Sequence, residues 1–133
     1  MSEAMKTPLN PVAVRRPFGN YNHGLLVPEG AQLLVTSGQL GIGTDDIVPE
    51  SAEEQAILCF EAIKAILEEG GMGFEDVIRI VGFVTKREDF PTYMAVRDRY
   101  TKDSLPVSTL IIVSGFTRPE FLVEVEVTAA KIV

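Results

Sequence analysis

Residues 51–71, SAEEQAILCFEAIKAILEEGG, constrain the fold most strongly because they carry helix signals at both ends and along their length. Ser51 with Glu54 three residues later has the form of a capping box, and Gly70 stands where a left-handed residue would end the helix. Apolar residues share one face and charged residues the opposite one: Ala56, Phe60, Ile63 and Leu67 against Glu54, Glu61, Lys64 and Glu68. Such an amphipathic helix requires a sheet to cover.

Short apolar runs before and after this helix supply the strands of that sheet. The runs GLLV (24–27) and AQLLVTSG (31–38), separated by a turn that contains Gly30, predict a β-hairpin. The β-branched run at 76–85 predicts the next strand, and 88–100 a second helix whose Pro91 falls in its first turn. Two further strands are expected near 107–114 and 121–132.

The expected order is therefore β-β-α-β-α-β-β, which defines an α+β domain with helices on one face of a mixed sheet. We expect an irregular N-terminal arm over 1–16 and a single domain over 17–133. Along the last strand, one row of side chains is apolar (Phe121, Val123, Val125, Val127) and the other is not (Leu122, Glu124, Glu126, Thr128). The apolar row is expected to pack under the helices.

Charge and cysteine content narrow the function classes. The net charge is −7, and the basic residues are scattered apart from the pairs at 14–17 and 85–88, which argues against nucleic acid as a partner. No apolar run approaches the roughly 18–20 residues that cross a bilayer, so no membrane association is expected. Cys59 is the only cysteine, which excludes an internal disulfide and fits a cytoplasmic protein.

Few residues have the spacing of a conventional site. One histidine, His23 in an expected loop, and one cysteine cannot supply a typical structural zinc site, so we expect no metal. Ser37 and Gly38 either present backbone N–H groups to an anion or only end a strand. Glu124 and Glu126 are either solvated, or salt-bridged to another subunit, or placed to hold a water or a polar ligand.

Five segments in order resemble the RidA family, also called YjgF or liver perchloric-acid-soluble protein. GNYNHG (19–24) looks like the family segment G-P-Y-S-Q-A, and VTSGQLG (35–41) is similar to L-S-G-Q-I-P. The helix, loop and strand at 60–90 follow the family pattern, and FLVEVEVTAAK (121–131) resembles its V-E-I-E-A-I-A ending. The resemblance runs from about Phe18 to Ile132.

This resemblance implies a chorismate-mutase-like fold and a homotrimer with small-molecule clefts between subunits. It also implies imine and enamine hydrolysis without cofactor or metal, with Glu124 holding the attacking water. Tyr21, Ser37, Gly38, Ser108 and Thr109 would then hold the substrate. In the active members an arginine in P-A-R-S binds the substrate carboxylate, but PVST (106–109) places Ser108 there, and Met94 stands where an asparagine is common.

Position 108 thus lacks the cation of the 2-aminoacrylate deaminases, and Arg16, Arg79 and Arg118 are the candidates to replace it. The leading hypothesis is a trimer that binds a small polar metabolite and hydrolyses an imine-like C–N bond with a different specificity. A non-catalytic binding or regulatory module is the alternative. Ribonuclease activity is the least favoured.

Overall fold

The computed structural model describes residues 6–133. Its strands and helices, in chain order and with two short 3₁₀ turns, are β1 (Thr7–Leu9), β2 (Gly24–Leu26), β3 (Gln32–Val35), β4 (Gln39–Leu40), α2 (Ala52–Glu69), η1 (Phe74–Asp76), β5 (Val77–Val84), η2 (Arg87–Asp89), α3 (Phe90–Thr101), β6 (Val107–Ile112) and β7 (Val123–Lys131). Neither described helix is long and apolar enough to cross a membrane.

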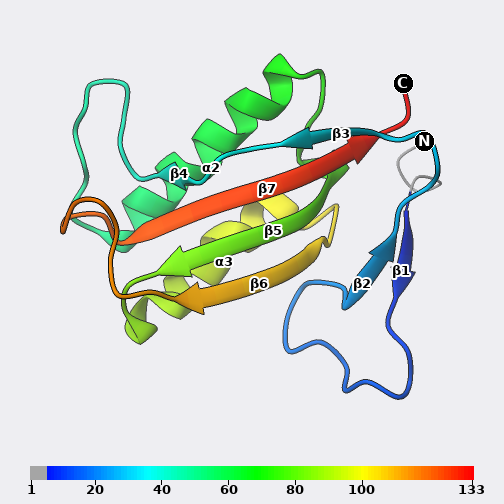
Figure 1. Cartoon of the computed structure of the whole chain (residues 1–133). Helices are drawn as coiled ribbons and strands as arrows, with labels where there is room; N and C mark the ends of the chain where they lie inside the picture. Colours follow the sequence, from blue (N-terminus) through cyan, green and yellow to red (C-terminus); the bar gives the residue numbers. More distant parts are fainter. Residues whose placement is uncertain (1–5) are drawn as a thin grey trace.

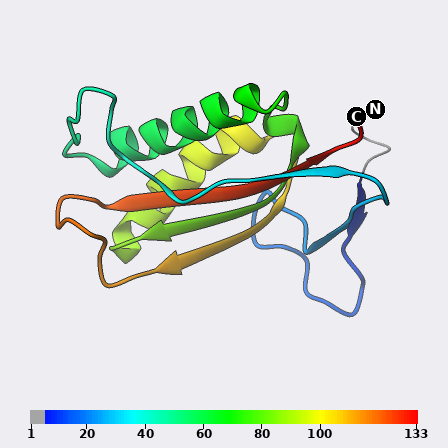
Figure 2. The same ribbon diagram turned by 45° about the horizontal axis from the view of Figure 1, so that its top comes forward.

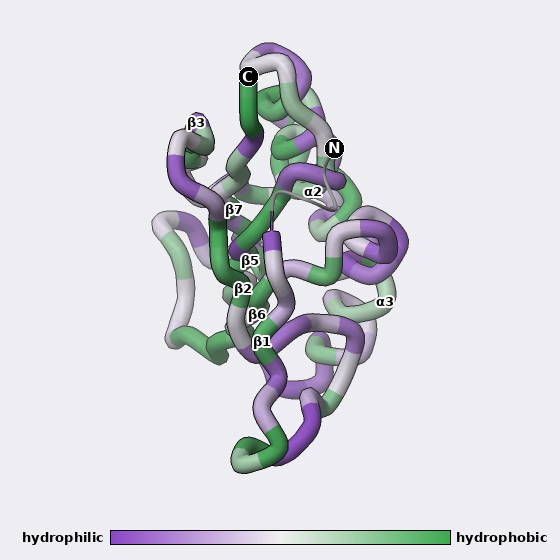
Figure 3. The backbone as a smooth tube through the Cα atoms, turned by 90° about the vertical axis from the view of Figure 1, so that its right-hand side faces the viewer, coloured by the Kyte–Doolittle hydropathy of each residue, from purple (hydrophilic) through white to green (hydrophobic). Residues whose placement is uncertain are grey.

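The main sheet is mixed and carries both helices on one face. Its strands run in the order β3-β7-β5-β6, with β4 also paired to β7 (Figure 1). The β5–β6 pair is parallel, and β7 is antiparallel to β3, β4 and β5. Figures 2 and 3 show α2 and α3 on the same side of the sheet from two directions. The predicted α+β architecture is confirmed; we call the uncovered side of the sheet its open face.

The predicted hairpin over 24–38 is wrong. Both of its strands form, but β2 pairs with β1 in a separate two-stranded sheet, whereas β3 pairs with β7. Gly30 lies between them with φ +86°, a left-handed conformation that glycine adopts easily. Pairing with β7 gives β3 a core contact through Leu34, which the short β2 does not offer.

Helix α2 begins as predicted and ends one residue later than predicted. The backbone N–H of Glu54 donates to Ser51 Oγ at 3.1 Å, and this hydroxyl donates to the Glu54 carboxylate at 3.1 Å. Gly70 is not left-handed, with φ −88°; the left-handed residue is Gly71, with φ +76°. The Gly71 N–H donates to the Glu68 carbonyl at 3.0 Å, so the chain reverses one position later than the sequence predicted.

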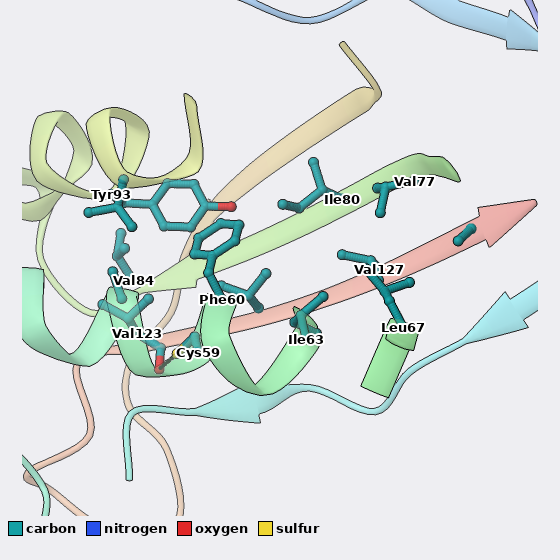
Figure 4. Close-up of a cluster of buried hydrophobic side chains, with 14 of the residues drawn as sticks. Cys59, Phe60, Ile63, Leu67, Val77, Ile80, Val84, Tyr93, Val123 and Val127 are labelled. Atoms are coloured by element: carbon teal, nitrogen blue, oxygen red, sulfur yellow. Dashed lines mark hydrogen bonds between the residues drawn. The ribbon is translucent and has the colours of Figure 1, made fainter. Parts of the chain in front are cut away.

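The core lies between α2, α3 and the covered face of the sheet. The predicted α2 stripe is fully buried, and the charged residues opposite it are exposed. Strand β7 alternates as expected, since Val123, Val125 and Val127 are buried and Glu124 and Glu126 only half-buried. Figure 4 shows Phe60 and Tyr93 facing the β5 and β7 valines. Cys59 belongs to this core and donates to the Val123 carbonyl at 3.7 Å.

Gln55 is a fully buried polar side chain that ties three segments together. Its Nε2 donates to the carbonyls of Pro49 at 2.8 Å and Glu120 at 2.9 Å. Its Oε1 accepts from the Leu122 N–H at 2.8 Å. Through this one amide, α2 fixes both the loop that precedes it and the loop that leads into β7.

Candidate functional site

A hollow of about 710 Å³ opens beside the edge strand β6. Its walls come from the loop after β1, from η2 and α3, and from β6 itself. The lining residues are Phe18, Tyr21, Arg87, Phe90, Met94, Arg97, Ser108 and Leu110. Two residues that the sequence singled out as ligand-binding, Tyr21 and Ser108, therefore meet in one place.

Backbone contacts hold the N-terminal wall of the hollow against β6. Asn22 forms a parallel bridge with Val107, and its N–H donates to the Pro106 carbonyl at 3.2 Å. The Asn22 side-chain amide also donates to the Leu105 carbonyl, at 2.7 Å. Tyr21 Oη accepts from the Phe18 N–H at 3.2 Å. These contacts place residues 18–22 beside the start of β6, where Ser108 faces α3.

The most informative residue of the hollow is Arg97, which the sequence analysis did not single out. Its side chain is only 4% exposed. Nη1 donates to Ser108 Oγ at 3.0 Å, while Nε and Nη2 donate to Asp98 Oδ1 at 3.1 and 2.9 Å. Asp98 Oδ2 in turn accepts from the Asn20 amide at 3.2 Å. The Arg97 guanidinium therefore lies directly beside Ser108, although residue 108 itself carries no positive charge.

None of the three arginines considered from the sequence is among the residues that line this hollow. Arg16 and Arg79 are exposed, and Arg118 pairs with Glu120 at 2.7 Å in the loop before β7. One signal in the sequence pointed to Arg97. It follows Met94, whose position was singled out, by three residues, and residues three apart share a helix face.

Glu124 and Gly38 form a second cluster, at the middle of β7. Pairing shifts from Val35↔Thr128 to Gln39↔Val125, so one extra residue is inserted between β3 and β4. This bulge brings Gly38 under Glu124 so closely that a Cβ atom on Gly38 would lie 2.6 Å from the carboxylate carbon. Only glycine fits there without moving Glu124. Ser37 is exposed at the same bulge.

The two clusters lie on opposite faces of the sheet. Ser108 pairs with Ile80, a core residue, so its side chain points to the side of the helices. Glu124 pairs with Phe83, three residues along β5 and therefore on the open face. Thr109 shares the open face with Glu124. One chain thus brings Tyr21, Arg97 and Ser108 together, and separately Gly38 and Glu124, but does not join the two groups.

The environment of Glu124 changes its acidity. Partial burial raises the pKa of this carboxyl above its ordinary value, and the neighbouring Glu126 raises it further. Both effects act in the same direction because each disfavours the charged carboxylate. A carboxyl with a pKa moved toward neutrality is better suited to exchange protons with a bound ligand or water.

We expect Glu124→Gln to raise the melting temperature at neutral pH and to lose this gain in acid. Because the folded-state pKa is raised, the stability contributed by Glu124 is fully present below its ordinary value of 4.5 and is lost as pH rises through the folded-state pKa. Glutamine has no such loss. Melting curves from pH 4 to 8 test this, with exposed Glu50→Gln as control; a difference independent of pH would contradict it.

His23, the one histidine of the sequence, contacts its own loop. His23 Nε2 contacts the Arg15 carbonyl, and the His23 backbone N–H donates to Asn10 Oδ1 at 2.8 Å. The histidine thus braces the loop that carries Tyr21. Within residues 6–133 no group of three histidine, cysteine or acidic side chains is placed to hold a metal ion.

A small α+β domain with a partly apolar hollow at a sheet edge and a half-buried carboxylate on its open face has the features typical of small-molecule-binding proteins. The sequence model of the family described as Endoribonuclease L-PSP matches residues 13–131. The chain belongs to this family, which is the RidA or YjgF family.

Relatives and solved structures agree with this membership. A RutC family protein of Saccharolobus solfataricus is 31% identical over 118 residues, covering 87% of this chain and 90% of that one. A 2-iminobutanoate/2-iminopropanoate deaminase of Dermatophagoides farinae is 27% identical over 109 residues, covering 80% of each. The fold matches a Rid-family protein of Yersinia pestis with TM-score 0.82 and 18% identity, covering 96% of this chain and 99% of that one.

Proposed function

We propose that the chain forms a homotrimer that binds a small polar metabolite in clefts between subunits and hydrolyses an imine- or enamine-type C–N bond. The observation that carries this proposal is Glu124, a half-buried carboxyl with a raised pKa seated over Gly38. Resemblance to a relative named as an iminoacid deaminase supports the same reaction class.

Two features of the sheet support the assembly. Large apolar side chains stand exposed on the open face, including Leu33 at 60%, Val35 at 72% and Ile111 at 41%. Apolar surface of this kind is favourably buried against another subunit. A single chain keeps the Glu124 cluster and the hollow on opposite faces of the sheet, and in the proposed trimer the Glu124 cluster of one chain meets the hollow of another in the cleft between them.

In this proposal Glu124 acts as a general base on a water molecule. Its carboxylate takes one proton while the water oxygen bonds to the imine carbon and the C=N electron pair moves to nitrogen, which takes up a proton. The carbinolamine then releases ammonia and leaves a carbonyl product. Tyr21, Ser37, Gly38, Ser108 and Thr109 hold the polar end of the substrate. Serine at position 108 gives a specificity different from that of 2-aminoacrylate deaminases.

The test combines light scattering with an imine panel. Imines are generated in place by an amino-acid oxidase with semicarbazide present, so that hydrolysis competes with semicarbazone formation. The expected result is a trimer that lowers semicarbazone yield for at least one imine. A monomer at micromolar concentration would contradict the clefts. A trimer without any effect on semicarbazone yield would contradict the hydrolysis and favour the binding module.

A further inference from the structure

We propose that Arg97 supplies, from α3, the cation that Ser108 lacks, and that the ligand of the hollow is a carboxylate with an apolar side chain. This inference rests on the proposed function, whose substrate class it narrows. It makes Arg97 a specificity-determining residue, placed on a helix rather than on β6.

The buried state of Arg97 is the first step. A charged side chain that is only 4% exposed is stable when it is paired and its donors are engaged. Asp98 accepts from Nε and Nη2 through a single oxygen, and Ser108 accepts from Nη1. The Asn20 amide donates to Asp98 Oδ2 at 3.2 Å and so holds the Asp98 carboxylate in place. Asp98 therefore fixes the guanidinium through Nε and Nη2, and Ser108 fixes it through Nη1.

Counting donors gives the second step. A guanidinium has five N–H groups, and the hydrogen bonds recorded among residues 6–133 engage three of them on Arg97. One N–H on Nη1 and one on Nη2 have no hydrogen-bond partner among these residues, and Arg97 is one of the residues that line the hollow. Two adjacent donors of a planar guanidinium match the two oxygens of a carboxylate.

The lining of the hollow gives the third step. Its only charged lining residues are Arg87 and Arg97, and no acidic side chain is among them. The rest is largely apolar and includes Phe18, Phe90, Met94 and Leu110. Such a wall favours an apolar group on the ligand through burial of its surface. A 2-oxo or 2-imino acid with a branched aliphatic or aromatic side chain fits both requirements.

Ser108 has a defined part in this arrangement. An arginine at position 108 would occupy the space that Arg97 reaches and would place two like charges together, which is unfavourable. The serine hydroxyl instead accepts from Nη1 and orients the guanidinium. Serine therefore replaces the family arginine at position 108 without loss of the positive charge, because α3 supplies it through Arg97.

The experiment compares 4-methyl-2-oxopentanoate with its neutral amide as probes, measured by calorimetric titration against the intact wild-type assembly. Wild type is expected to bind the acid more tightly than the amide. Arg97→Gln is expected to weaken acid binding by about 10- to 100-fold, as for loss of a charged hydrogen-bonded pair, and to leave amide binding unchanged. Arg97→Lys, which keeps the charge but not the planar fork, should fall between them.

The matched control is Arg99→Gln, an exposed arginine two residues further along α3 that does not line the hollow, and it is expected to change acid affinity by no more than about threefold. Melting curves and light scattering verify that each variant remains folded and assembled; if Arg97→Gln does not, Arg97→Lys decides. Equal binding of acid and amide by wild type, or no binding of either probe at millimolar concentration, would overturn the inference.

The outcomes separate this inference from the proposed function. Acid binding that depends on Arg97, in a protein without imine turnover, contradicts the hydrolysis alone. Turnover of imines that is indifferent to a carboxylate on the substrate contradicts the role of Arg97 alone.

Discussion

We expect Glu124→Gln to hydrolyse imines about a hundredfold more slowly or slower still, because general-base catalysis contributes roughly 10²–10⁴-fold to the rate. Glutamine keeps the shape and the hydrogen-bonding oxygen but cannot take a proton from water. The measurement is kcat on the best imine of the panel. The loss should fall on kcat rather than on KM, because in the proposed mechanism Glu124 acts on the attacking water and not on the ligand's carboxylate.

The matched control is Glu126→Gln, two residues along the same strand and on the same face. This variant is expected to keep activity within a few-fold. Because Glu126 contributes to the raised pKa of Glu124, its removal should also move the acid limb of the rate profile to lower pH. Equal losses in the two variants, or near wild-type kcat in Glu124→Gln, would remove Glu124 from the mechanism.

A loss of about 3 kcal/mol in the free energy of unfolding is expected for Gln55→Leu, at roughly 1 kcal/mol for each of its hydrogen bonds. Leucine is similar in volume but leaves the Leu122 N–H and two carbonyls without their partner. Urea unfolding measures the change. Lys64→Leu, on the exposed side of the same helix, is the control and should stay within about 0.5 kcal/mol. A similar loss in both variants would show that the Gln55 amide has no special part.

Local signals explain which parts of the fold could be predicted. The Ser51 cap and the α2 stripe act within one helix, and the alternation of β7 acts within one strand, so both are visible in the sequence. Strand partners are not local. Strand β3 pairs with β7, about a hundred residues away, and not with the nearby β2, which is why the hairpin prediction failed.

The candidate site also has residues that local signals predict and residues that they do not. Glu124 and Gly38 carried signals in their own segments, and the structure brings them together through a bulge that spacing does not reveal. Arg97 was missed because the one signal in the sequence, its spacing of three residues from Met94, does not show what that face of the helix packs against. Its importance comes from the packing of α3 against β6, which places the guanidinium 3.0 Å from Ser108.

The bridge between Asn22 and Val107 has a consequence for when the hollow can exist. Its walls come from residues near 20, near 90 and near 108, so a chain emerging from the ribosome has no hollow until β6 is complete. Closing so long a loop is a late step, because its entropy cost precedes any contact that it makes possible. A ligand that needs all three walls stabilises only the finished fold and cannot assist the earlier stages of folding.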